Sequence, residues 1–211
     1  ELNAWALPGG KIAVNRGLLV QLEDESELAA VLGHEIVHAA ARHGARAEET
    51  DTLLGIGLAV LGIATANSAY QDLAMRGAQI SGTLIRTRYG REAELQSDYY
   101  GMQYMARAGY DPQGAVRLQE RFVELSRGGR QDWLSGLFAS HPPSQERVDA
   151  NRRTAQKLGP GADGRDEYQR HIARLKRDQP AYEAYDNGLA AMNAGRYEAA
   201  LGYSEQALAL Q

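Results

Sequence analysis

Residues 24–47 are the segment that most restricts how this chain can fold. Asp24 lies three residues before Glu27, a spacing that is typical of the N-terminal cap of a helix. Apolar residues then recur at helical spacing. These positions are Leu28, Val31, Leu32 and Ile36. The pattern predicts one amphipathic helix that runs to about Ala47.

Two histidines lie on one face of this predicted helix, in the run His-Glu-Ile-Val-His at 34–38. Positions i and i+4 share a helix face, so His34 and His38 can bind one zinc ion together. Glu35 falls beside such a metal, where the general base for a hydrolytic reaction is needed. Gly33 permits the close approach of a neighbouring backbone. The alternative interpretation is a pair of surface histidines on an amphipathic helix.

The absence of cysteine limits which other side chains can complete such a site. The 211 residues contain no Cys and five His. Disulfide scaffolds, iron–sulfur clusters, thiolate zinc fingers and cysteine nucleophiles are therefore excluded. A third protein ligand must be a histidine or a carboxylate. His43 comes nine residues after His34 and is expected on a different helix face, either as a structural residue that supports the ligands from behind or as a surface residue.

The acidic segment at 91–98 offers a carboxylate ligand. Glu94 and Asp98 are one helical turn apart and are expected to face the same way. One of them can bind the metal while the other orients a ligand imidazole. The alternative is a plain solvated acidic face.

Composition excludes further classes of protein. Hydrophobic residues make up 44% and charged residues 24% of the chain, which is enough apolar side chain for a folded core. A formal net charge of -4 argues against a nucleic-acid partner. Residues 52–66 are nearly all apolar but fall short of the roughly 20 residues that cross a bilayer. A buried or partner-facing helix is expected there, with membrane contact left open and no crossing.

Three regions are expected along the chain. Residues 1–158 should form a mainly α domain with a small β-sheet (α+β), opening on a hairpin at 3–14 around the turn Pro8-Gly9-Gly10. The Gly- and Pro-rich stretch at 159–165 is read as a linker, and 166–211 as a helical region. The further helices expected are 75–108, with a break near Tyr89–Gly90, then 113–125 and 145–158. Because the chain opens close to a strand and without Met, we expect an incomplete N-terminal domain in a processed product.

The spacing of small and aromatic residues after 185 predicts one tetratricopeptide repeat, with a close helix contact and then a Gly-x-Tyr turn. The residues that match are Gly188, Gly195, Tyr197, Ala200, Ala207 and Leu208. The Trp and Leu usual near the start of such a repeat are replaced by Ala184 and Asn187. A single repeat cannot bury its apolar face. Either more repeats follow it, or it packs on the first domain.

Four motifs occur in one order along residues 3–152. They are Asn-Ala-x-Ala-x-Pro-Gly-Gly-x-Ile at 3–12, HExxH at 34–38, ExxxD at 94–98 and Ser-His-Pro-Pro-x-x-x-Arg at 140–147. With these motifs the chain resembles the peptidase family of HtpX and the CAAX prenyl endopeptidases. It fits best the soluble, BepA-like branch, whose members carry tetratricopeptide repeats.

This resemblance implies a gluzincin-type zinc endopeptidase. One zinc ion per chain would be held by His34, His38 and Glu94, with Glu35 as the general base. Asp98 would orient a ligand imidazole by bonding the ring nitrogen that does not bind the metal. Zinc would make a water molecule acidic near neutral pH, and Glu35 would carry the proton to the leaving amine.

The His-Pro motif gives two further site residues. In the resembled family the histidine of this motif lies at the rim of the active site, which here is His141. It either stabilises the oxyanion or occupies the fourth zinc position as a self-inhibitory plug. A third alternative is a capping histidine held by two prolines. Arg147 is expected to anchor this loop by a salt bridge rather than assist the oxyanion.

The resemblance also implies how substrate is bound. Gluzincin substrates usually lie extended along an edge strand, and the candidate residues here are Asn3, Ala4, Trp5 and Ala6. Such backbone recognition suits unfolded or misassembled chains. We therefore expect a quality-control protease that is gated by the His141 loop or by the segment at 66–79. The alternative is a chaperone-like assembly adaptor whose zinc site is largely self-inhibited.

Partners and location follow from the same resemblance. The expected partners are polypeptide substrates and, through the repeat region, outer-membrane assembly machinery. The expected location is the bacterial periplasm, reached by export with a signal peptide that this chain does not include.

Overall fold

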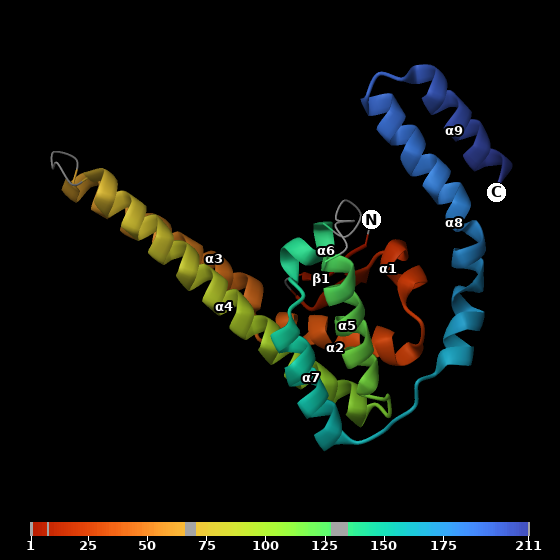
Figure 1. Ribbon diagram of the computed structural model, residues 1–211, viewed down its shortest axis with the longest axis horizontal. Coiled ribbons are helices and arrows are strands. Elements are labelled where there is room, and N and C mark those ends of the chain that lie inside the picture. The colour runs from red at the N-terminus through yellow and green to blue at the C-terminus, as the bar shows by residue number, and fades with distance from the viewer. Residues whose placement is uncertain (1, 8, 66–70, 128–134, 211) are drawn as a thin grey trace.

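The computed structural model describes residues 2–7, 9–65, 71–127 and 135–210 (Figure 1). Within these residues, a pair of short strands is followed by helices, so the predicted mainly α class with a small sheet is confirmed. The elements are β1 (Ala4–Leu7), β2 (Lys11–Val14), α1 (Arg16–Gln21), α2 (Glu25–Ala40), α3 (His43–Thr65), α4 (Gln71–Arg107), α5 (Gln113–Arg127), α6 (Ser135–Ser140), α7 (Gln145–Leu158), α8 (Arg165–Asn193) and α9 (Tyr197–Ala209).

The predicted hairpin is present. Strands β1 and β2 pair antiparallel, with Ala4 opposite Val14 and Leu7 opposite Lys11. Gly9 and Gly10 have φ angles of 91° and 81°, a region that only glycine adopts readily. Pro8, the first residue of the predicted turn, lies outside the described residues.

Helix α2 begins where the sequence indicates but ends earlier. The Asp24 carboxylate accepts a hydrogen bond of 3.0 Å from the backbone N–H of Glu27. The helix stops at Ala40, and Arg42 adopts a φ of 57°. A residue in the left-handed region cannot continue a right-handed helix. The prediction of one helix to about Ala47 is therefore wrong, because the chain turns at 41–42 and restarts as α3.

Helix α2 lies at the centre of the first region and contacts α4, α5 and β1. Apolar side chains on its buried face join two core clusters. One cluster contains Leu2, Ala4, Leu18, Leu22, Val31, Leu118, Leu137, Tyr168 and Ile172. The other contains Ala30, Met102, Met105, Ala115, Val116 and Ala155. The rest of α2 is free to carry polar side chains toward α4.

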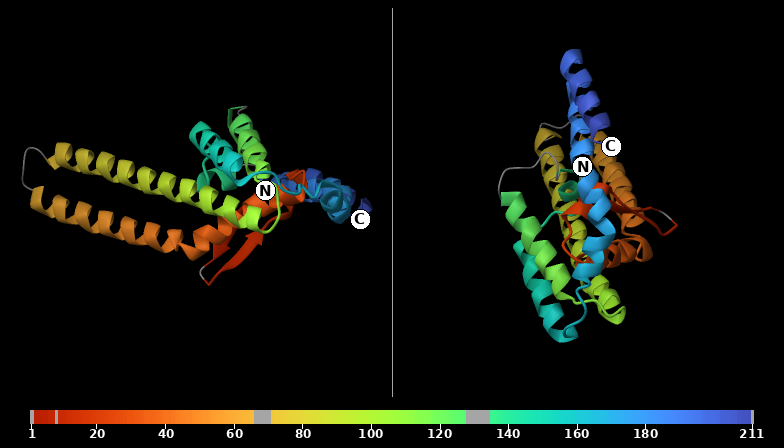
Figure 2. Two further views of the ribbon diagram at one scale, coloured as in Figure 1. Left: turned by 90° about the horizontal axis from the view of Figure 1, so that it is seen from below. Right: turned by 90° about the vertical axis from the view of Figure 1, so that its right-hand side faces the viewer.

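Helices α3 and α4 form a long antiparallel pair that projects from the rest of the protein (Figure 2). Helix α4 is continuous, so the predicted break near Tyr89–Gly90 is wrong. Large apolar side chains of α3 are exposed to between 57% and 79%, so the part of the chain that the structure describes does not bury them. They are Leu53, Ile56, Val60 and Ile63. Of the predicted lid at 66–79, residues 66–70 lie outside the described residues.

None of the helices, over the residues that the structure describes, combines the length and the hydropathy that a membrane crossing requires.

Helices α8 and α9 form an antiparallel pair at the C-terminal end (Figure 1). A Cβ on Gly188 would lie 3.4 Å from the Cβ of Tyr203, so the two helices approach closely there. The first turns of α8 belong to the core of the first region, because the Tyr168 hydroxyl donates a 2.6 Å hydrogen bond to the carbonyl of Leu19. The helix pair has the form expected of a tetratricopeptide repeat. Its identity as one and the division at 159–165 stay predictions.

Candidate metal centre

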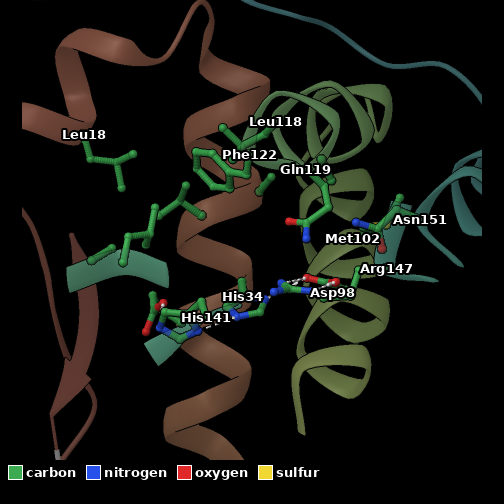
Figure 3. Close-up of a pocket in the computed structure, with 16 residues that line it drawn as sticks. Leu18, His34, Asp98, Met102, Leu118, Gln119, Phe122, His141, Arg147 and Asn151 are labelled. Carbon is green, nitrogen blue, oxygen red and sulfur yellow. Dashed lines mark hydrogen bonds and ion pairs between the residues drawn. The ribbon is translucent and has the colours of Figure 1, made fainter. Parts of the chain in front are cut away.

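Three helices and one loop bring the predicted site residues together. Figure 3 labels four of them, which are His34, Asp98, His141 and Arg147. Helix α2 carries His34 and His38 on consecutive turns of one face, because i and i+4 share a helix face, and Glu35 directly follows His34. Helix α4 crosses α2 and carries Glu94 and Asp98. The loop after α6 supplies His141, and the first turn of α7 supplies Arg147.

Four of these side chains converge on one point. The Nε2 atoms of His34 and His38 are 2.9 Å apart. The Glu94 carboxylate lies 3.4 Å from His34 Nε2 and 3.1 Å from His38 Nε2. Nδ1 of His141 lies 3.1 Å from Glu94 Oε1, and the candidate ligand atoms of all four residues lie within 4.8 Å of one another. Imidazole nitrogens and a carboxylate are the donors that zinc accepts in a chain without thiolates, so the residues fit this metal.

Asp98 sets the orientation of the His34 ring. Its Oδ1 lies 2.9 Å from His34 Nδ1, so that nitrogen donates to the carboxylate and Nε2 is left facing the cluster. Burial opposes protonation of His34, but the carboxylates of Asp98 and Glu94 outweigh it and raise its pKa to about 9. A metal that binds through Nε2 must therefore displace a proton.

Arg147 holds both carboxylates of α4. Its Nε and Nη2 atoms donate to the two oxygens of Asp98 at 2.7 and 2.8 Å, and its Nη1 atom lies 2.8 Å from Glu94. Burial opposes ionisation of Asp98, but this guanidinium lowers its pKa below the usual range. Nη1 also donates to the carbonyl of Pro142 at 3.2 Å. The same side chain thus connects the carboxylates to the His-Pro loop.

Glu35 and His141 lie on the same side of the cluster. The Glu35 side chain is almost fully buried, and its Oε1 atom lies 3.4 Å from Nε2 of His141. His141 therefore lies between the predicted general base and the predicted ligands. Nδ1 of His141 is also 3.3 Å from Nε2 of His34.

His43 contacts a predicted ligand, His38, and the helix face expected for it is wrong. The expectation of a different helix face assumed one continuous helix, whereas α2 ends at Ala40. The turn brings Nδ1 of His43 to 3.0 Å from Nδ1 of His38. Only the short spacing between the two histidines could have suggested the contact. His171, by contrast, is exposed on α8.

A pocket opens beside Glu35 and His141 (Figure 3). Its apolar wall comes from β1, α1, α2, α4, α5 and α6, and includes Ala4, Leu18, Val31, Met102, Leu118, Phe122 and Leu137. Of the four predicted substrate contacts, the structure brings Ala4 to this pocket. Asn3 pairs with Asn15 through its backbone N–H, and Trp5 is 40% exposed. Ala6 is half-buried and does not line the pocket.

The family model of peptidase family M48 matches residues 1–155. The mitochondrial metalloendopeptidase OMA1 of Arabidopsis thaliana is 34% identical over 146 residues, covering 69% of this chain and 28% of that protein. The beta-barrel assembly-enhancing protease of Yersinia pestis is 31% identical over 167 residues, covering 76% of this chain and 34% of that protein. The chain thus spans about a third of the length of these relatives.

These similarities confirm the predicted zinc metallopeptidase class, the predicted metal cofactor and the relationship to beta-barrel assembly-enhancing proteases. They do not test the roles of individual residues, which stay predictions. The match over most of the chain, together with the converging cluster of histidines and a carboxylate, shows that the chain belongs to peptidase family M48.

Proposed function

We propose that this protein is a zinc-dependent endopeptidase that cleaves unfolded or misassembled polypeptides in quality control of the cell envelope. One observation carries the proposal. A buried carboxylate that does not belong to the ligand cluster, that of Glu35, lies next to the converging side chains of His34, His38 and Glu94. A general base beside a metal cluster is the arrangement that peptide hydrolysis requires.

The ligands would be His34, His38 and Glu94. Zinc bound there would supply Lewis-acid polarisation of the scissile carbonyl and lower the pKa of water towards about 7. Glu35 takes the proton of the attacking water and delivers it to the leaving amine. Asp98 and Arg147 hold the ligands in place, so that little rearrangement is needed as negative charge develops.

Substrate recognition would use β1 and the apolar pocket. Among the described residues, β1 pairs with β2 alone, which leaves its other edge for an extended polypeptide. Ala4 of β1 lines the pocket together with Glu35, so a strand added there passes the candidate base. The apolar lining suits a large apolar side chain next to the cleaved bond. Backbone pairing and an apolar anchor both favour unfolded chains, which expose such residues.

His141 would gate this site. Its Nδ1 atom lies among the predicted ligands and its Nε2 atom lies near Glu35, so it occupies the space that a substrate carbonyl needs. This position supports the self-inhibitory plug over the oxyanion helper. A substrate would have to displace the loop, which spares folded neighbours. Arg147 holds the loop through Pro142 and is the proposed anchor.

The C-terminal helix pair would dock partners. Tetratricopeptide repeats present a concave surface to peptides and proteins. The similarity to beta-barrel assembly-enhancing proteases supports outer-membrane assembly machinery as the partner and the bacterial periplasm as the location. We take 1–158 as the peptidase domain, 159–165 as the linker and 166–211 as the docking region.

A second candidate function is an assembly adaptor that keeps zinc but cleaves little, because His141 plugs the site. The distances around His141 support this candidate too. The two candidate functions differ in the rate of peptide cleavage while His141 occupies the site.

Cleavage of casein with zinc supplied, measured for three variants, tests the proposal. Wild type should cleave, and Glu35→Gln should lose at least about a hundredfold in rate while still binding zinc, because it removes the general base alone. His171→Ala, an exposed histidine on α8, is the matched control and should cleave as wild type does.

His141→Ala separates the gate from the oxyanion helper. The gate predicts faster cleavage in His141→Ala than in wild type, whereas an oxyanion helper predicts slower cleavage. Very low cleavage by wild type with strong activation in His141→Ala would favour the adaptor. No zinc in wild type would exclude both functions.

A further inference from the structure

His43, the first residue of α3, makes a set of polar contacts that the proposed reaction does not use. Its Nδ1 atom lies 3.0 Å from Nδ1 of His38, and the two rings meet edge-on with centroids 4.8 Å apart. Its Nε2 atom lies 2.8 Å from Oε1 of Gln96 on α4. The Ser97 hydroxyl lies 3.3 Å from the same Nδ1 atom.

For two neutral imidazoles, the positions of the protons follow from these contacts. Oε1 of Gln96 is an acceptor, so Nε2 of His43 carries the hydrogen. A neutral imidazole has one N–H, so Nδ1 of His43 is an acceptor. It therefore accepts from Nδ1–H of His38, which leaves the lone pair of His38 on Nε2. That nitrogen faces the cluster of His34 and Glu94.

We propose that His43 is a positioning residue that fixes the tautomer and the ring orientation of His38, with Gln96 holding His43 in turn. The inference rests on the metal site of the proposed function. The two ligand histidines of α2 would thus be held in place by partners of different chemistry. His34 donates to the carboxylate of Asp98, whereas His38 donates to a neutral chain of imidazole and amide.

The backbone between α2 and α3 makes this contact available. In a continuous helix, residues 38 and 43 would lie on different faces. Arg42 adopts a φ of 57°, which ends α2 and returns His43 over His38. A non-glycine residue in this region costs about 1 kcal/mol or more and is found mostly where the surrounding structure requires it. The exposed Arg42 side chain gives no other reason for the turn.

Zinc affinity of the full chain, measured by competition with a chromophoric chelator, tests the proposal. His43→Ala should weaken zinc binding by about 10- to 100-fold, as expected when the partner of a ligand imidazole is lost. His43→Gln should restore most of the affinity, because its amide oxygen can accept from His38 while its NH₂ group donates to Gln96. His171→Ala is the matched control and should leave affinity unchanged.

A further measurement separates positioning from a merely structural role. Thermal unfolding without zinc should be similar in His43→Ala and His43→Gln. Equal zinc affinity in wild type and His43→Ala would overturn the proposal. So would a loss in His43→Ala that His43→Gln does not restore.

The outcome is also distinguishable from that of the proposed function. A wild-type protein that binds zinc but cleaves nothing would contradict the peptidase, while the affinity difference between His43→Ala and His43→Gln would still support positioning by His43.

Discussion

Gly33 and Gly101 lie backbone against backbone where α2 crosses α4. A Cβ on Gly33 would lie 2.7 Å from the carbonyl oxygen of Gly101, and a Cβ on Gly101 would lie 2.8 Å from the backbone nitrogen of His34. Neither contact is tolerable, and backbone atoms cannot rotate away. The expected role of Gly33, close approach of a neighbouring backbone, is confirmed. This crossing sets the separation of the histidines of α2 from the carboxylates of α4.

Gly101→Ala should therefore weaken the metal site. The added methyl group must push α4 away from α2, at a cost of about 1 to 3 kcal/mol in the free energy of unfolding. The same shift moves Glu94 from His34 and His38, so zinc affinity should fall as well. Calorimetric zinc titration and urea unfolding would measure the two effects.

Gly90→Ala is the matched control for that substitution. Gly90 lies in the same helix, and a Cβ there would meet nothing within 4 Å. Alanine has the higher helix propensity, so stability should stay equal or rise slightly. Equal zinc binding in Gly101→Ala and Gly90→Ala would contradict the role given to the crossing.

Arg147→Lys should loosen the same site from the other side. Lysine keeps the charge but cannot bond both oxygens of Asp98 as the guanidinium does. We expect a loss of about 1 to 3 kcal/mol in stability, together with weaker zinc binding. Arg152→Lys on the same helix is the control, because its partner Glu120 is exposed and such pairs contribute about 1 kcal/mol or less. Similar losses in both variants would count against the anchoring role.

Zinc should raise the unfolding temperature of the full chain. Its proposed ligands come from α2 and α4, which are brought together only in the folded state, so binding stabilises that state. The expected gain is about 2.7 kcal/mol when free zinc is a hundred times its dissociation constant. Removal of zinc by a chelator should reverse the shift, and His34→Ala should show almost none. A shift of the same size in His34→Ala would place the metal elsewhere.

Asp24 should make stability depend on pH. Burial opposes its ionisation, but hydrogen bonds from Ser26 and the backbone of Glu27, with the charge of Arg117, lower its pKa. Because the folded pKa is the lower one, the stabilisation is present above the unfolded pKa of about 3.9. It is lost as pH falls through the folded pKa.

Asp24→Asn isolates this effect. Asparagine caps a helix about as well as aspartate, so the variant removes mainly the charge. Zinc-free wild type should exceed it in stability by about 1 to 3 kcal/mol near neutral pH. The difference should shrink below about pH 4. Denaturant unfolding at a series of pH values would measure this difference. A difference that stays constant across that range would show that the charge of Asp24 does not stabilise the fold.

Local rules in the sequence were sufficient for several parts of the fold. The cap at Asp24, the hairpin turn and the boundaries of α7 were each predicted from a few neighbouring residues. The interruption at Arg42 was not predicted, because the residues before and after the turn are all compatible with helix. The sequence also left open whether α3 is buried or faces a partner, since an apolar run indicates a helix but not what covers it.

The sequence by itself determined which side chains could form a metal site. Helix periodicity places His34 and His38 on one face of the first helix, and Glu94 and Asp98 on one face of a second helix. The absence of cysteine limits the donors to imidazole and carboxylate. Those rules act within a few residues and hold in any packing arrangement.

Only the tertiary structure decided how these side chains meet. The rotation of α4 against α2, set at the glycine crossing, turns Glu94 toward both histidines and leaves Asp98 behind His34. Contacts over long separations bring His141 among them, and a single turn brings His43 behind His38. No local spacing encodes such contacts, because they depend on how whole helices pack.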